Sequence, residues 1–357
     1  MKSIPASWRS GPASDKELNP PHGRPVPPTQ ITALAVQNDQ VVTASSDHGL
    51  RVYNVNTGAA VRQLYNKNFG HKEWVTACAW LRDGRVWSGA MDSMLCLWDR
   101  RAVRCDNMSA HQGSISALMV DDADVGISAS YDKSLIVWDL QRQQPLTVCA
   151  NVHQAPVLTF DWHNSLVVSG DRAGVIAYWV LSRQDINTGQ CLHHKPTHKG
   201  QVQRVQLASD AASTNVVLST GTNDGQLIVT DMRTHQPSYQ KQIHRASINF
   251  LAMTLSNTVV TGSFDSSLKV LDAVMSYQER AVLASTAGVL CGEMMENLAI
   301  AGCADGNVNV FDIDTEECLF GYGVDSQGAV NCLATAFNRK RLVTGGESGT
   351  PLLLLFS

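Results

Sequence analysis

One pattern recurs along almost the whole chain and limits what the chain can fold into. Each copy begins with an apolar segment, then passes through a polar turn into a short strand that carries Ser or Thr among small residues. A tight turn with Asp or Gly follows, and a third strand closes the copy. Short strands separated by turn residues predict an all-β fold of repeated small sheets. The copies end at intervals of 40 to 51 residues, at Tyr53, Trp98, Trp138, Trp179, Thr230, Leu271, Phe311 and Leu354.

The two clearest copies carry the same four residue types at the same spacing. They are His71, Ser88, Asp92 and Trp98 in one copy and His111, Ser128, Asp132 and Trp138 in the next. With a period of about 40 residues and these Trp-Asp closures, the chain resembles the WD40-repeat β-propeller family over residues 29–357. The resemblance implies blades of four antiparallel strands, in which each His, Ser, Asp and Trp form a buried hydrogen-bonded set. Eight copies predict eight blades; seven, the commonest number in the family, is the alternative.

The other six copies keep only part of this set. We expect the hydrogen bonds to stiffen the second and third blades most, and the last two blades to depend on apolar packing, because unpaired buried polar groups are costly. The retained residues are His244, Thr261 and Asp265 in the sixth copy, His198, Thr220 and Asp224 in the fifth, His153 and Ser169 with Ala173 at the Asp position in the fourth, Thr43 and Asp47 in the first, Asp305 in the seventh, and Thr344 with Ser348 at the Asp position in the eighth.

Residues 1–28 form a Pro-rich segment ahead of the propeller. Residues 1–30 hold seven of the 12 prolines, and the last copy ends on its third strand. In the family the N-terminal segment commonly supplies the missing outer strand. Either a strand at residues 4–9 anchored by Trp8 does so here, or the Pro-rich stretch follows the edge irregularly, or the segment is a tail.

Charge and apolar content argue against nucleic acid and membrane as partners. The net charge of −4 and pI near 6.2 do not suit a protein that neutralises phosphates. No apolar run approaches the roughly 20 residues that span a bilayer. Residues 1–30 also lack the apolar stretch of a secretory signal. We expect a cytoplasmic protein, with cytoskeletal or nuclear association left open.

Candidate chemistry is absent from the sequence pattern. The nine cysteines form no CxxC pair and lie mostly in apolar, strand-like segments, which indicates reduced core residues rather than disulfides or zinc ligands. His193 and His194 fall in a presumed extended loop at about residues 182–197, without Cys or carboxylate partners at ligand spacing. No phosphate-binding glycine loop or nucleophile elbow occurs. We therefore expect neither catalysis nor a cofactor nor a metal.

Partner binding is the remaining function. The family resemblance implies that residues beside the first apolar residue of each inner strand, or just before the turn Asp, lie at the rim of the propeller. Aromatic, Met and Arg side chains there are typical of binding hot spots. We expect a peptide or loop of another protein to dock on them, with Arg172 binding a carboxylate or phosphate, within a hetero-complex; the alternative is that some rings pack between blades. These rim residues are Trp74, Met91, Tyr131, Leu158, Arg172 and Phe264.

A second motif gives an alternative function from another class. The closure Trp98-Asp99-Arg100-Arg101 resembles the box of propeller substrate receptors in cullin-RING ubiquitin ligases. The resemblance implies that Asp99 and Arg101 dock on the ligase adaptor. The simpler interpretation is that the arginine only pairs with a neighbouring carboxylate, an interaction of small energy at an exposed site.

Overall fold

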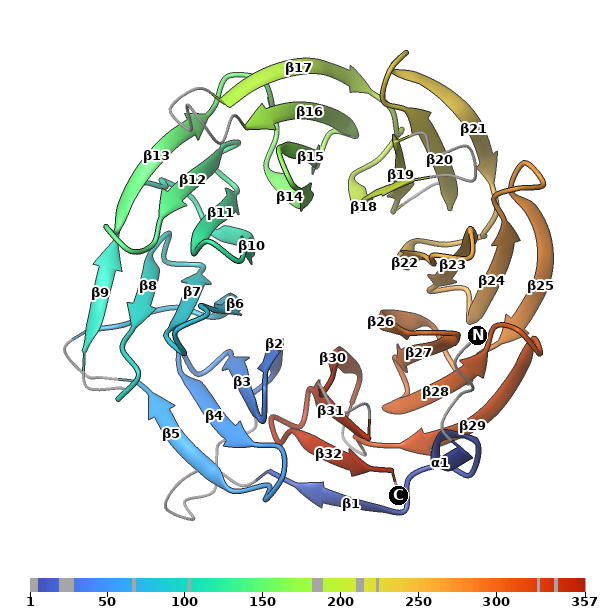
Figure 1. Ribbon diagram of the computed structural model, residues 1–357, viewed down its shortest axis with the longest axis horizontal. Helices are drawn as coiled ribbons and strands as arrows, with labels where there is room; N and C mark the ends of the chain where they lie inside the picture. The colour runs from blue at the N-terminus through green and yellow to red at the C-terminus, as the bar shows by residue number, and fades with distance from the viewer. Residues whose placement is uncertain are drawn as a thin grey trace. The chain divides into compact units, whose positions relative to one another are not determined.

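The described strands form eight sheets of the same kind. A computed structural model describes residues 6–18, 29–65, 69–101, 104–181, 189–209, 215–222, 225–325, 328–336 and 340–356. Each sheet has four antiparallel strands, and seven of the eight follow the order of the chain (Figure 1). This confirms the predicted all-β propeller with eight four-stranded blades and excludes the seven-bladed alternative.

The chain divides into two compact units of four blades each. The first unit contains residues Met1–Ser109 and Leu283–Ser357. The first blade consists of β2 (Ile31–Gln37), β3 (Gln40–Ser45), β4 (Leu50–Asn54) and β5 (Ala60–Leu64), and the second blade of β6 (Val75–Trp80), β7 (Val86–Ala90), β8 (Leu95–Trp98) and β9 (Cys105–Met108). The seventh blade consists of β26 (Val289–Met295), β27 (Leu298–Cys303), β28 (Asn307–Asp312) and β29 (Glu317–Gly323). The eighth blade consists of β30 (Val330–Thr335), β31 (Arg341–Gly346), β32 (Leu352–Leu355) and β1 (Ser14–Glu17).

The second unit contains residues Ala110–Val282, that is, the third to sixth blades. In each unit the inner strands of successive blades contact one another, β26, β30, β2 and β6 in the first and β10, β14, β18 and β22 in the second. The strands of the second unit are β10 (Ile115–Val120), β11 (Val125–Ser130), β12 (Leu135–Asp139) and β13 (Gln144–Cys149), then β14 (Val157–His163), β15 (Leu166–Asp171), β16 (Val175–Leu181) and β17 (Gly189–Pro196), then β18 (Val202–Ser209), β19 (Asn215–Gly221), β20 (Gln226–Asp231) and β21 (Gln236–Gln242), and finally β22 (Ile248–Met253), β23 (Thr258–Ser263), β24 (Ser267–Asp272) and β25 (Gln278–Ala284).

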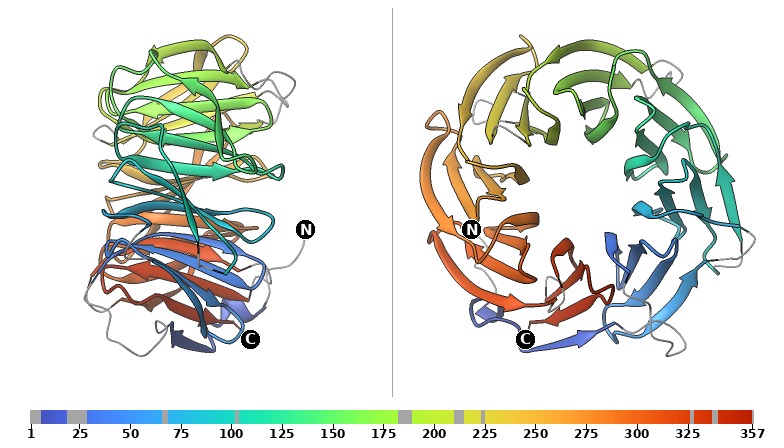
Figure 2. Two further views of the ribbon diagram at one scale, coloured as in Figure 1. Left: turned by 90° about the vertical axis from the view of Figure 1, so that its left-hand side faces the viewer. Right: turned by 180° about the vertical axis from the view of Figure 1, so that it is seen from behind.

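The outer strand of the eighth blade comes from the N-terminal segment. Strand β1 pairs antiparallel with β32, from Ser14 opposite Leu355 to Glu17 opposite Leu352, and Figure 2 shows the blue β1 beside the red β32 from behind as well. The strand expected at residues 4–9 is wrong within its described part, where Ala6–Arg9 form the short helix α1. The helical turn buries the Trp8 ring, whereas β1 is a charged, fully exposed edge strand.

The extended loop expected in the fourth blade is also wrong where the structure describes it. Residues 189–196 form β17, which pairs with β16 from Val175 opposite Pro196 to Leu181 opposite Gly189. The polar sequence of β17 does not show the alternation typical of a strand, because an outer strand that faces solvent does not need apolar alternation. Residues 182–188 of the expected loop lie outside the described residues.

Candidate partner-binding surface

The second blade and the third blade each contain one complete hydrogen-bonded set of His, Ser, Asp and Trp. In the third blade, His111 Nε2 lies 2.7 Å from Ser128 Oγ, and Trp138 Nε1 donates to the same oxygen at 2.8 Å. His111 Nδ1 lies 2.8 Å from Asp132. Burial alone would raise the pKa of Asp132, but hydrogen bonds to His111 and Ser134 hold that pKa well below its ordinary value. The second blade repeats this arrangement with His71, Ser88, Asp92 and Trp98.

The fourth blade has a complete set with its acid at an unexpected position. His153 Nδ1 lies 2.9 Å from Asp171, His153 Nε2 lies 2.7 Å from Ser169 Oγ, and Trp179 Nε1 donates to that oxygen at 2.8 Å. The acid is therefore present, and Ala173 only occupies the turn position where Asp was expected. Asp171 follows Ser169 by two residues on the same strand, so both side chains point to the same face.

The fifth and sixth blades carry partial sets. In the fifth, His198 Nε2 lies 3.0 Å from Ser219 Oγ, whereas Thr220 donates to the carbonyl of Ile248, so the assignment of Thr220 was wrong by one residue. Asp224 lies outside the described residues. In the sixth, His244 lies 3.0 Å from both Thr261 and Asp265, as its spacing predicts.

The remaining blades replace the set with other polar contacts. In the first blade, Asp47 pairs with Arg51. In the seventh, Asn309 Nδ2 donates to Ser285 and Thr286 at 2.9 and 3.0 Å. In addition to the apolar packing that we expected, the seventh blade thus contains hydrogen bonds from the buried Asn309 to the half-buried Ser285 and the exposed Thr286. In the eighth, Thr344 Oγ1 makes only a long bond of 3.5 Å to the carbonyl of Leu352.

The residue before each turn is held in the same way in several blades. The amide of Met91 donates to the carbonyl of Trp74, and the amides of Tyr131, Arg172 and Phe264 make the corresponding bond to Ser114, Pro156 and Ser247, all at 2.9 Å. These residues therefore occupy equivalent corners of their blades. The exposed fractions are 43% for Trp74, 46% for Met91 and Tyr131, and 51% for Phe264, which is high for large apolar side chains.

The other two rim residues lie in the fourth blade. Arg172 is exposed at the corner of its turn. Leu158 is half-buried, and the pairing of β14 with β15 shifts register between Val157 and Thr159, so Leu158 is the extra residue of a bulge. Trp74 and Met91 belong to the first unit, and the remaining rim residues belong to the second.

Arg62 lies near the Trp-Asp-x-Arg closure, and the sequence did not predict this. Arg62 lies 5.6 Å from the centre of the Trp80 ring, and its Nη2 donates to the carbonyl of Gly84 at 3.1 Å. Burial lowers the pKa of Arg62, and the charge of Asp99 partly offsets this. Asp99 therefore interacts with a cation of its own unit, while Arg101 is exposed.

Comparison with known proteins agrees with this geometry. The family model "WD domain, G-beta repeat" matches residues 62–99, where the closure and set of the second blade lie. The chain carries a WD40 repeat in its second blade and folds as a β-propeller of eight four-stranded sheets. The computationally designed Ika8 protein, a solved structure, is similar over 92% of this chain and 97% of its own, with a TM-score of 0.79 and 26% identity.

Natural relatives of this WD40-repeat protein are distant. Telomerase protein component 1 of Mus musculus is 28% identical over 118 residues, which cover 33% of this chain and 4% of that protein. The ribosome biogenesis protein WDR12 homolog of Drosophila persimilis is 23% identical over 273 residues, 70% of this chain and 63% of its own length. The chain therefore spans only part of these relatives.

Two properties of the described residues bear on other kinds of site. Within them, no group of three or more His, Cys, Asp or Glu side chains is arranged to hold a metal ion. The described helix is too short to cross a bilayer, at four residues.

Proposed function

We propose that this WD40-repeat protein is a non-enzymatic platform for protein–protein contacts and a subunit of a hetero-complex. In each unit a peptide or loop of a partner docks on the rim residues, which are Trp74 and Met91 in the first unit and Tyr131, Leu158, Arg172 and Phe264 in the second. The observation that carries the proposal is the exposure of three large apolar side chains at equivalent, backbone-bonded corners (Met91, Tyr131 and Phe264) and of Trp74, whose carbonyl accepts the hydrogen bond from the Met91 amide. Large apolar side chains that stay exposed next to one another, as Trp74 and Met91 do on either side of one backbone hydrogen bond, are typical of interaction surfaces.

The backbone that carries these side chains favours binding. Each corner amide is hydrogen-bonded, and the buried sets of the second to fourth blades hold the neighbouring strands. Because little backbone has to be ordered on association, more of the apolar gain appears as affinity. Full burial of one such side chain contributes about 1.5–3 kcal/mol. Arg172 adds an exposed guanidinium that can bind an acidic group of the partner.

The names of the relatives agree with a role in larger assemblies. One is named a protein component of telomerase and another a ribosome biogenesis protein. These names support participation in a complex and leave the partner of this chain to experiment.

Alanine substitutions at the rim test the proposal. Trp74→Ala and Tyr131→Ala remove one anchor in each unit, and affinity purification followed by quantitative mass spectrometry reads out the partners. Loss of an anchor typically costs about 2 kcal/mol or more, so we expect at least one partner to fall by roughly tenfold or more. Leu255→Ala is the control, because Leu255 is fully exposed at the turn between β22 and β23. An unchanged partner set in correctly folded rim variants would refute the proposal.

The ligase-receptor alternative has weaker support. The charge of Asp99 already acts on Arg62 of the same unit, so adaptor docking would have to compete with this electrostatic attraction. Arg101→Ala followed by cullin co-purification separates the two functions: loss of a cullin would favour the receptor, and an unchanged purification favours the platform.

A cytoplasmic location is part of the same proposal. All nine cysteines lie among the described residues, and none forms a disulfide. Burial raises the pKa of Cys78 and Cys149 to about 12, so these thiols stay protonated. Nine cysteines without a disulfide are typical of a reducing compartment. Imaging of a fluorescent fusion tests the location.

A further inference from the structure

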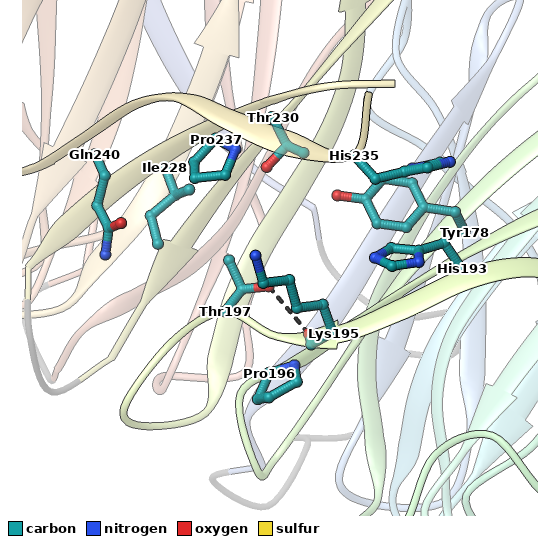
Figure 3. A pocket seen from close by; sticks show the side chains of 10 residues that line it. All are labelled: Tyr178, His193, Lys195, Pro196, Thr197, Ile228, Thr230, His235, Pro237 and Gln240. Atoms are coloured by element: carbon teal, nitrogen blue, oxygen red, sulfur yellow. Dashed lines mark hydrogen bonds between the residues drawn. The ribbon is translucent and has the colours of Figure 1, made fainter. Parts of the chain in front are cut away.

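A polar pocket lies between the fourth and fifth blades, within the second unit. Its volume is about 220 Å³, and strands β16 and β17 of one blade and β20 and β21 of the next line it (Figure 3). None of the rim residues takes part in it. The side chains that matter for its chemistry are Tyr178, His193, Lys195, Thr197, Thr230 and His235.

Two imidazole rings and a phenol form one wall of the pocket. The rings of His193 and His235 stack with their centres 4.6 Å apart and their planes at 23°. The buried Tyr178 meets His235 edge-on at 5.1 Å. Imidazole nitrogens bind metals in the plane of the ring, so two nearly parallel rings do not aim their nitrogens at a common ion. The stack therefore disfavours a metal site and leaves the ring edges as hydrogen-bond donors.

The pocket is cationic and lacks its own counter-charge. Lys195 and the two histidines line it, and none of its ten lining residues is acidic. The nearest carboxylate along the chain, Asp231, is hydrogen-bonded by the amide and the guanidinium of Arg233 at 2.7 and 3.2 Å. Burial lowers the pKa of His193, and the charges of His235, His194 and Lys195 lower it further. An anion in the pocket would relieve this repulsion.

Size and remaining polar groups define the class of anion. The pocket is small, at about 220 Å³, which suits a small anion. The Thr230 hydroxyl and the Gln240 amide add polar groups to the lining. A small oxyanion with several acceptor oxygens matches this set.

We propose that the pocket between the fourth and fifth blades binds a phosphate group through the Lys195 ammonium and the ring N–H groups of His193 and His235. The phosphate is either free in solution or carried on a phosphorylated side chain of a partner. The site is separate from the rim residues, so its failure would leave the platform function intact.

Calorimetric titration of the full chain tests the site with two probes. Inorganic phosphate represents the free anion, and a phosphoserine tetrapeptide with otherwise neutral residues represents the phosphoprotein. Both titrations run at constant ionic strength set with sodium chloride. We expect saturable binding, and a Kd at least about tenfold weaker in Lys195→Gln and His193→Gln, because each loses a hydrogen bond to a charged group.

The matched control is His194→Gln, which changes an exposed histidine on the same strand that does not line the pocket. We expect its Kd to equal that of the unmodified chain. Lys195→Arg keeps the charge and should retain binding, which separates loss of the site from loss of fold. Tighter binding of the peptide identifies a phosphoprotein as the source, and equal binding identifies free phosphate.

A second readout follows the histidine itself. Phosphate beside an imidazole favours its protonated form, so the pKa of His193 measured by nuclear magnetic resonance should rise when phosphate is added. Absence of saturable binding by both probes, or equal weakening in His194→Gln, would overturn the proposal.

Discussion

At the scale of single residues, one serine hydroxyl in the fourth blade forms hydrogen bonds with two buried ring nitrogens. Ser169 Oγ lies between His153 Nε2 and Trp179 Nε1, at 2.7 and 2.8 Å, and is fully buried. Ser169→Ala leaves both ring nitrogens without this partner. Each unsatisfied buried group costs about 1–3 kcal/mol, so we expect the free energy of unfolding, measured in urea, to fall by about 2–6 kcal/mol.

A second serine of the same blade serves as the control. The half-buried Ser165 precedes β15, and Ser165→Ala should change the free energy of unfolding by less than about 0.5 kcal/mol. If both variants lost the same small amount, the set around Ser169 would be energetically unimportant.

Whether the sequence predicts a hydrogen-bonded set of His, Ser, Asp and Trp depends on whether its Asp lies in a turn or on a strand. The sets of the second and third blades follow from one spacing, because their acids sit in turns of equal length. Asp171 escaped that spacing, although the two-residue period of a strand from Ser169 would have found it. Arg62 could not have been found, because its contact with Trp80 joins strands of different blades and leaves no local pattern.

At the scale of elements, helix α1 anchors the outer strand of the eighth blade. The ring of Trp8 is fully buried and stacks on Phe356 with 3.7 Å between ring centres and 13° between planes. Arg9 adds an ion pair with Asp312 at 3.2 Å. Large-to-small substitution of a buried tryptophan costs about 3–5 kcal/mol, so Trp8→Ala should lower the free energy of unfolding by that amount.

Trp74→Ala is the matched control for Trp8→Ala, since the same atoms are removed from an exposed site. We expect it to change stability by less than about 0.5 kcal/mol. Equal destabilisation by both substitutions would show that α1 contributes no specific anchoring.

Strand β1 shows why this element was hard to predict. Its sequence Ser-Asp-Lys-Glu is fully exposed and has no apolar alternation, so only its pairing with β32 identifies it as a strand. Trp8, by contrast, was recognisable as an anchor from its apolar ring in a Pro-rich segment. The N-terminal source of the outer strand was therefore predictable from the family resemblance, but its position depended on contacts with residues more than 300 positions away.

At the scale of the whole molecule, the repeat predicted the number and strand content of the blades, because eight similar copies each need partners to bury their apolar faces. It did not predict how evenly the blades are stabilised. Three blades hold a complete set of His, Ser, Asp and Trp, and the seventh holds the Asn309 network instead. The seventh and eighth blades, which we expected to depend alike on apolar packing, therefore differ in their polar contacts.

The eighth blade should open before the second blade of the same unit. All four residues of its outer strand β1 are exposed, whereas the outer strand β9 of the second blade buries Cys105 and Met108. Thr344 of the eighth blade makes a single long hydrogen bond of 3.5 Å. The second blade has a complete set, with Ser88 fully buried. Since local opening follows the least-supported contacts, we expect amides of β30, β31 and β32 to exchange with deuterium faster than those of β6, β7 and β8.

Mass spectrometry of peptides after timed deuterium labelling measures this difference. Trp8→Ala should increase exchange in β32 and β1 further, because the stacking partner of Phe356 is lost, while β6 to β8 stay unchanged. Equal protection of the eighth and second blades in the unmodified chain would mean that apolar packing alone decides local stability. The hydrogen-bonded sets would then matter for the alignment of strands rather than for resistance to opening.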